Sequence, residues 1–287
     1  MSDHTPLTRA SVPEMDAILG ESFPCLDHGF IRVVDYMGND PAIVQAARVS
    51  YAEGTKTLRH DRGLIRYLMR HRHTSPFEMC ELKLHVKLPI FVARQWIRHR
   101  TASVNEISGR YSILKDEFYV PEADFLAKQA SDNKQGRDVT LAPVEAELVQ
   151  EILRDAARAD SSTYHDLLEH QELARELARL ALPVSTYSEW YWKIDLHNLL
   201  HFMSLRLHPH AQKEFQVYAQ VIADILKVWV PLTWEAFVDY RMEAHTFSRQ
   251  EMDALRKYVH MHGDPTEHLD GVSDREMHAF LDALGTD

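Results

Sequence analysis

The stretch ELKLHVKLPIFVARQWIRHR, residues 81–100, predicts a strand that runs directly into a helix. Apolar residues alternate with charged residues and a histidine from Glu81 to Leu88, which is the pattern of a strand buried on one face. Pro89 ends the alternation, and proline suits the first turn of a helix, here one that continues through Arg98. We therefore expect a sheet with helices packed against it.

Further helix and strand signals flank this segment on both sides. The expected strands are residues 30–37, 81–88 and 186–194. The expected helices are residues 40–48 (capped by Asp40), 61–71, 89–98, 144–169, 173–182, 195–207, 210–228 and 231–243, with weaker signals at 249–259 and 274–284. Residues 101–112 are expected to form a loop, and residues 127–139 an exposed insertion.

Composition limits the class of protein. The chain has 287 residues, 45% of them apolar and 26% charged, which is ordinary for a globular protein with one large domain or two modest ones. A pI near 5.9 argues against a general nucleic-acid binder. No apolar run approaches the roughly 18 residues of a membrane span, and the N-terminus has no secretory signal pattern. Cys25 and Cys80 form neither a disulfide framework nor a metal motif, so we expect a cytoplasmic enzyme.

An arginine cluster is the strongest clue to function. Between residues 91 and 110, Arg94, Arg98, Arg100 and Arg110 face only one acidic residue, Glu106, although the whole chain carries a net charge of −11. Arginine presents a planar fork that suits phosphate oxygens. A solvated basic face with salt bridges would also explain such a cluster. The interleaved serines, asparagine and glycine favour a bound, phosphate-bearing small molecule instead.

Familiar nucleotide-binding motifs are absent from the sequence. It contains neither GxGxxG nor GxxxxGK[ST], so a Rossmann or P-loop site is not supported. Ser108 could in principle be a nucleophile, with His99 as a base that is close in space. A role for Ser108 as a hydrogen-bonding ligand of the substrate is the simpler interpretation.

Ordered sequence blocks give the chain a family resemblance. Arg98-His99-Arg100 is followed by seven residues and Ser108, and the other blocks are YMGND (36–40), QAARVS (45–50), HTSPFE (73–78) and an LP…Y…W…LR…HAQ pattern over 182–212. In these blocks, from about residue 28 to 245, the chain resembles the flavin-dependent thymidylate synthases (ThyX family). That resemblance implies an α+β fold, with helices packed on a curved, mostly antiparallel sheet.

The resemblance also implies a reaction and a set of site residues. The expected reaction is methylation of dUMP to dTMP, with carbon from 5,10-methylenetetrahydrofolate and hydride from FAD that NADPH has reduced. Arg206 is the expected catalytic residue, polarising the pyrimidine. The dUMP residues would be Gln95, Arg98, Glu106, Ser108, Gly109, Arg110, Arg179 and Arg206. The FAD residues would be Ser50, His73, Ser75, Arg98, His99, Arg100 and Glu106, with Asp195, Leu196, His197 and His201 from a neighbouring subunit.

Domain organisation and assembly are also expected from the resemblance. Residues 29–245 would form the synthase domain, with an N-terminal extension over 1–28 and a helical C-terminal extension over 246–287. The protein would be a homotetramer with sites at subunit interfaces. Its partners would be small molecules (dUMP, the folate and NADPH) rather than nucleic acid or membrane.

Histidines leave a second interpretation open. His197 and His201 are four residues apart on an expected helix, with His208 and His210 following, and this spacing can hold zinc. His71, His73 and Glu78 offer a second cluster, so the alternative is a zinc metalloenzyme acting on a nucleotide. His197 and His201 also stand where some family members carry asparagine or arginine, and His208 stands where an acidic residue is expected. A nucleotide-binding regulatory module without catalysis is a further alternative.

Overall fold

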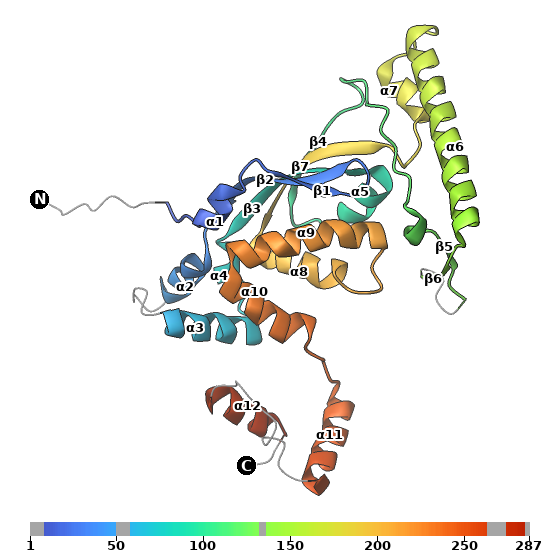
Figure 1. Ribbon diagram of the computed structural model, residues 1–287. Helices are drawn as coiled ribbons and strands as arrows, with labels where there is room; N and C mark the ends of the chain where they lie inside the picture. The colour runs from blue at the N-terminus through green and yellow to red at the C-terminus, as the bar shows by residue number, and fades with distance from the viewer. Residues whose placement is uncertain (1–8, 50–57, 132–135, 263–273, 285–287) are drawn as a thin grey trace, which may run out of the picture. The chain divides into compact units, whose positions relative to one another are not determined.

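The computed structural model describes residues 9–49, 58–131, 136–262 and 274–284. The chain divides into two compact units, Met1–Met242 and Glu243–Asp287. The first unit is built around a five-stranded sheet in the order β1-β2-β3-β7-β4, and every neighbouring pair is antiparallel (Figure 1). The mixture of helices with an antiparallel sheet confirms the expected α+β fold.

The sheet is centred on the segment that the sequence marks most clearly. Its strands are β1 (Ser22–Cys25), β2 (Gly29–Met37), β3 (Glu81–Pro89), β7 (Tyr187–Asp195) and β4 (Ser103–Glu106). In β3 the side chains of Leu82, Leu84, Val86 and Leu88 are 0% exposed, as the alternation predicted. These side chains contribute to the hydrophobic core of the first unit. A second, two-stranded sheet pairs β5 (Ala127–Gln129) with β6 (Arg137–Thr140).

Helices pack around the sheet. The helices of the first unit are α1 (Pro13–Ala17), α2 (Asp40–Arg48), α3 (Leu58–Arg70), α4 (Ser75–Glu78), α5 (Ile90–Trp96), α6 (Pro143–Glu169), α7 (Arg175–Ala178), α8 (Leu196–Arg206), α9 (Lys213–Trp229) and α10 (Pro231–Phe237). Short 3₁₀ turns occur at Ala123–Phe125 and Arg179–Ala181, and a π-helical turn occurs at Val238–Met242. The long α9 packs against β1 and β2, while α8 packs against β7.

The second unit contains two helices. They are α11 (Arg249–His262) and α12 (Asp274–Leu284), and they contact each other. The weak helix signals at residues 249–259 and 274–284 are thereby confirmed. The predicted domain boundaries at residues 28 and 245 stay predictions.

Tryptophans fill the centre of the core. Trp96 from α5 lies edge-on to Trp192 of β7, with 5.2 Å between ring centroids, and to Trp190 at 6.0 Å. Phe202 of α8 packs against Trp96 at 5.0 Å. All four side chains are almost fully buried. This packing holds the C-terminal end of α5 against β7 and α8. It therefore also sets the position of residues 97–100, which follow α5 directly.

A buried carboxylate ties α2 to α10. Asp40 accepts hydrogen bonds from the backbone N–H of Leu232 at 2.8 Å and of Thr233 at 3.0 Å, and from the Thr233 hydroxyl at 2.6 Å. Burial raises the pKa of Asp40 above its usual value. The expectation that Asp40 caps α2 was wrong, because Asn39 accepts the capping bond from Ala42 N at 3.0 Å. Asp40 is the first residue of α2, and its carboxylate accepts hydrogen bonds from the first turn of α10 instead.

Three further sequence expectations need correction. Residues 101–112 were expected to be a loop, but Ser103–Glu106 pair with β7 as the edge strand β4. No strand was expected before residue 30, but Ser22–Cys25 form β1 and pair with β2. The helix expected over residues 173–182 is only α7 followed by a 3₁₀ turn.

Candidate functional site

The junction of β3 and α5 places the arginine cluster. Backbone bonds from Ile90 N to Thr186 O (2.9 Å) and from Phe91 N to Val184 O (3.0 Å) hold the first turn of α5 against the segment before β7. The helix ends at Trp96 and a turn follows at residues 97–98, after which Arg98 and Arg100 are exposed and His99 is half-buried. Because these bonds hold α5, Arg98-His99-Arg100 lies at a fixed position relative to the sheet.

Three guanidinium groups of the cluster have no carboxylate partner among the residues that the structure describes. The side chains of Arg94, Arg98 and Arg100 are exposed, and none forms an ion pair with any residue in the described segments. A solvated face with salt bridges would pair them, so this arrangement fits the alternative of a ligand anion. Arg98 and Arg100 are both predicted FAD residues, and Arg98 is also a predicted dUMP residue.

Arg206 lies where α8 ends, next to the same turn. Its Nε–H donates to Nε2 of His99 at 3.0 Å, and its guanidinium lies 4.6 Å from the centre of the Phe215 ring. Burial lowers the pKa of Arg206. Burial, the Arg206 charge and His201 together lower the pKa of His99 to about 4. His99 is therefore a neutral imidazole that accepts at Nε2, which leaves Nδ1 to carry the ring proton.

The low pKa of His99 predicts a pH dependence of stability. The folded-state pKa of about 4 lies below the ordinary value of 6.5, so stability from neutral His99 is complete above pH 6.5 and falls as the pH drops from 6.5 to 4. We expect His99→Gln to weaken that decline in thermal melts between pH 7 and pH 4. The exposed His170→Gln should leave the decline unchanged. Parallel melting curves for wild type and His99→Gln would contradict this prediction.

A second group of predicted residues meets in the loop after β4. Arg110 N donates to the hydroxyl of Ser108 at 3.3 Å, and Arg110 Nε pairs with Glu176 at 3.1 Å. Arg179 Nε donates to the carbonyl of Glu176 at 3.3 Å. The buried Gly109 lies beside Arg179, since a Cβ built on Gly109 would be in van der Waals contact with Arg179 Cδ at 3.5 Å. The structure thus brings together four predicted dUMP residues.

Two more predicted residues have partners that sequence reasoning missed. Glu106, at the end of β4, accepts a hydrogen bond from the hydroxyl of Ser188 on β7. Gln95 donates from its amide to the side chain of Gln212, which precedes α9. Gln212 belongs to the HAQ block, so the block itself could have suggested a role. Nothing in the sequence singled out Ser188.

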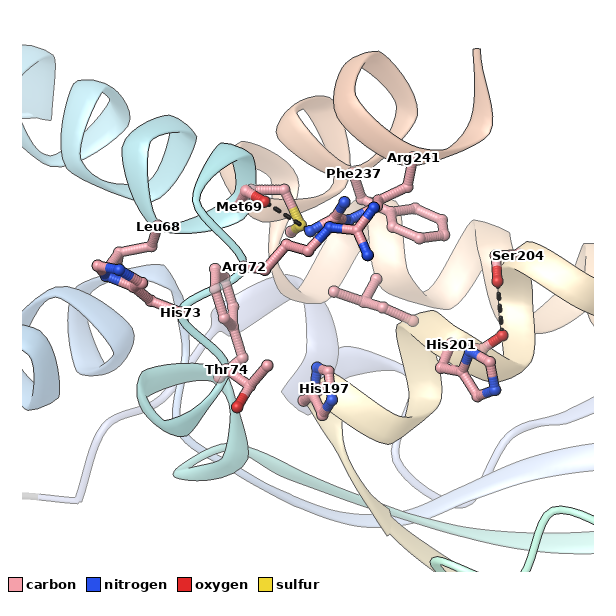
Figure 2. A pocket seen from close by; sticks show the side chains of 12 residues that line it. Leu68, Met69, Arg72, His73, Thr74, His197, His201, Ser204, Phe237 and Arg241 are labelled. Carbon is pink, nitrogen blue, oxygen red and sulfur yellow. Dashed lines mark hydrogen bonds between the residues drawn. The ribbon is translucent and has the colours of Figure 1, made fainter. Parts of the chain in front are cut away.

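A cavity of about 370 Å³ collects three predicted FAD residues (Figure 2). His73 follows α3, and His197 and His201 lie on α8. His201 also lies near His99, with 6.4 Å between ring centroids, so the cavity adjoins the Arg206 group. Arg72 and Arg241 line the same cavity, and sequence reasoning assigned neither of them.

Ser75, Asp195 and Leu196, which are also predicted FAD residues, do not line this cavity. Ser75 lines a neighbouring cavity of about 760 Å³, to which His73 also contributes. Asp195 caps α8 by accepting a bond from Asn198 N at 2.9 Å, and the side chain of Leu196 is fully buried. Ser50 lies outside the described residues.

The described segments contain neither a cluster of metal ligands nor a membrane-spanning helix. Within residues 9–49, 58–131, 136–262 and 274–284, no three histidine, cysteine, aspartate or glutamate side chains are placed to hold a metal ion. His197 and His201, which the zinc alternative would use as ligands, line the cavity together with Arg72 and Arg241. Across those segments, no helix is both long enough and apolar enough to cross a bilayer.

Comparison with known proteins decides the family. Residues 32–232 match the family described as "Thymidylate synthase complementing protein". The flavin-dependent thymidylate synthase of Ruegeria pomeroyi is 53% identical over 291 residues, covering 98% of this chain and 94% of the relative. The chain belongs to the flavin-dependent thymidylate synthases. The flavin-dependent thymidylate synthase of Wolbachia pipientis is 57% identical over 252 residues, covering 88% of each chain.

A solved structure shares the fold of this flavin-dependent thymidylate synthase. The UMP/dUMP methylase PolB from Streptomyces cacaoi, bound with 5-Br dUMP, is 37% identical with a TM-score of 0.71. The match covers 77% of this chain and 99% of PolB. The structural likeness agrees with the family assignment and extends it to the arrangement of the sheet and helices.

Proposed function

We propose that this chain methylates dUMP to dTMP, with carbon from 5,10-methylenetetrahydrofolate and hydride from FAD that NADPH has reduced. The observation that carries the proposal is the half-buried Arg206, held by neutral His99 close to Arg98 and Arg100, which form no ion pair within the described segments. Family membership supports this reaction, because the relatives are named for it.

The loop after β4 is the proposed phosphate site of dUMP. Ser108 offers a hydroxyl, and Arg110 and Arg179 offer guanidinium groups from two directions. The pair between Arg110 and Glu176 is exposed on both sides, and exposed pairs contribute little stability. A phosphate that brings two negative charges can replace Glu176 as the partner of Arg110. Ser108, whose hydroxyl accepts a bond from the same loop, acts as a ligand rather than as a nucleophile.

Arg206 is the proposed catalytic residue. C5 of uracil becomes a better carbon nucleophile when negative charge on the ring oxygens is stabilised, and a fixed cation at that edge supplies the stabilisation. The bond to His99 and the contact with Phe215 hold the guanidinium in one place before substrate arrives. Because Arg206 is half-buried, its charge acts through a medium of lower dielectric than water.

The side chains around the cavity fit a flavin. FAD combines an anionic pyrophosphate with a flat, hydrogen-bonding ring system. Arg98 and Arg100, which have no protein anion in the described segments, would hold the pyrophosphate. His73 would bond or stack against the rings, together with His197 and His201 of a neighbouring subunit. When bound, the flavin supplies the hydride, while the protein provides orientation and electrostatics.

The test is an anaerobic assay for dTMP formation. The purified protein should be yellow, and it should convert dUMP to dTMP with the folate and NADPH, with added FAD restoring any flavin lost in purification. A colourless protein that contains stoichiometric zinc would instead support the metalloenzyme. A protein that binds dUMP but forms no dTMP under these conditions would support the regulatory module.

We further propose a cytoplasmic homotetramer whose sites are shared between subunits, with FAD contacted by Asp195, Leu196, His197 and His201 of a neighbouring subunit. An exposed apolar stripe along α6 supports assembly. Val144, Leu148 and Ile152 recur every four residues and are 78%, 58% and 58% exposed. An amphipathic helix with an uncovered apolar face commonly marks a subunit contact.

The state of the cysteines supports the cytoplasmic location. Cys25 and Cys80 are free and buried, which suits a reducing compartment.

Disrupting that stripe should change the assembly. Leu148→Glu puts a charge in the middle of the stripe, and we expect it to shift the protein to a smaller species in sedimentation analysis. Activity should fall with it, because the proposed sites need two subunits. Glu147→Gln, which changes the preceding residue, should sediment as wild type. If Leu148→Glu kept the wild-type mass, α6 would not be an assembly surface.

A further inference from the structure

Two arginines share one wall of the 370 Å³ cavity. Arg72 lies just after α3, and Arg241 lies in the π-helical turn after α10. Figure 2 shows their guanidinium groups converging, and the charge of Arg72 acts on Arg241. Arg241 donates from Nη2 to the carbonyl of Met69 at 2.7 Å, which fixes its direction.

No carboxylate in the described part of the chain neutralises the positive charge of this pair. No aspartate or glutamate is among the residues that line the cavity. The neighbouring α3 arginines, Arg62 and Arg66, pair with Glu235 and Asp239, so these carboxylates are already engaged. The Arg72 side chain forms no hydrogen bond or ion pair with the described residues. Two converging cations are therefore left with room for an anion between them.

The backbone around Arg72 adds a second observation. Arg72 has a φ of 58°, a left-handed conformation that residues other than glycine rarely adopt. This residue belongs to the C-terminal cap of α3, in which Arg72 N donates to Met69 O at 3.3 Å and His73 N donates to Leu68 O at 3.0 Å. The cap turns the chain so that Arg72 lines the cavity. In addition, burial and the Arg72 charge both lower the pKa of Arg241. Bringing these two like charges together is unfavourable unless a ligand of opposite charge joins them.

We propose that Arg72 and Arg241 bind the 2′-phosphate of NADPH and give the enzyme its preference for NADPH over NADH. This inference rests on the proposed function. Two guanidinium groups match a phosphate monoester, which carries a charge close to −2 at neutral pH. Each phosphate of the flavin pyrophosphate carries only one charge, and Arg98 and Arg100 are available for that group. Arginine is also the residue that accommodates the 2′-phosphate in other NADP enzymes.

The decisive measurement is anaerobic flavin reduction by each nicotinamide nucleotide. Wild type should reduce its flavin with higher efficiency from NADPH than from NADH. Arg72→Gly suits the left-handed backbone and removes only the side chain, so folding should be kept. We expect Arg72→Gly and Arg241→Ala each to lower the ratio of kcat/KM for NADPH to kcat/KM for NADH about 10- to 100-fold. This is the effect expected when one charge-assisted hydrogen bond to the 2′-phosphate is lost. Efficiency with NADH should stay at the wild-type value.

Binding of a fragment provides a readout that needs no turnover. In calorimetry with the holoenzyme, 2′,5′-ADP should bind wild type more tightly than 5′-AMP does, and Arg72→Gly should remove the difference. Arg62→Ala is the matched control, since it removes an arginine from α3 that already pairs with Glu235, and it should keep the difference. An unchanged preference in both Arg72→Gly and Arg241→Ala would overturn the proposal.

Two further measurements separate this inference from its alternatives. Loss of bound FAD in both variants would overturn the proposal by assigning the pair to the flavin pyrophosphate. With dithionite in place of NADPH, both variants should form dTMP at the wild-type rate, and a matching loss of rate would also overturn it. If wild type formed no dTMP but its NADPH preference depended on the pair, only the proposed reaction would fail.

Discussion

Arg206→Ala is expected to leave a folded, yellow protein whose rate of dTMP formation falls about 100- to 1,000-fold, the usual cost of removing one preorganised charged donor. The loss should appear in kcat rather than in dUMP affinity, because the phosphate is proposed to bind at Ser108, Arg110 and Arg179 instead. Anaerobic turnover with saturating substrates measures the effect.

Arg206→Lys provides the matched control for geometry. Lysine keeps a positive charge but cannot reproduce the planar fork that donates from Nε to His99. Partial activity in Arg206→Lys would separate the contribution of charge from that of orientation. Thermal melts should show that both variants fold, although the contact with Phe215 is lost in the alanine variant. Full turnover by Arg206→Ala would rule out the proposed role.

Asp40→Ala is expected to lower the free energy of unfolding by about 3 kcal/mol, because it leaves buried donors without an acceptor. The backbone N–H groups of Leu232 and Thr233 and the Thr233 hydroxyl would all lose their partner. Since these bonds join α2 to α10, the cost should not be confined to one helix. Urea unfolding followed by circular dichroism measures it.

An exposed aspartate provides the comparison for Asp40. Asp224 lies on α9 and pairs with Lys227 at 2.7 Å, with both side chains largely in solvent. Asp224→Ala should change stability by no more than about 0.5 kcal/mol, as expected for surface pairs. Equal losses in the two variants would show that the buried carboxylate has no special contribution.

The elements with one buried face could be predicted from sequence. Strand β3 alternates because one face enters the core, and α6 was found within one residue of its ends. Strand β4 was missed because all four of its residues are exposed, so no apolar alternation marks it. Strand β1 is short and contains Pro24, which argues against a strand. Edge strands therefore escaped prediction for a physical reason.

Some residues of the candidate site could likewise be predicted from the sequence, and others could not. Arg98, His99 and Arg100 were found because they are contiguous and follow a strong strand-helix signal. The resemblance supplied Arg206, but its bond to His99 joins residues 107 positions apart, and no local pattern contains that information. Ser188, Arg72 and Arg241 were missed for the same reason. Their relevance arises only when distant segments meet in the fold.

Strand β7 has a mechanical consequence for ligand capture. Along one side it pairs with β4, which leads into Ser108–Arg110, and at its end it passes through Asp195 into α8, which finishes at Arg206. The loop with Ser108–Arg110 and the end of α8 with Arg206 are therefore both joined to β7. Because they share this strand, they move together rather than independently. A binding site whose two parts are already held at a fixed separation loses little conformational entropy when its ligand binds. More of the attraction from each contact then appears as net affinity.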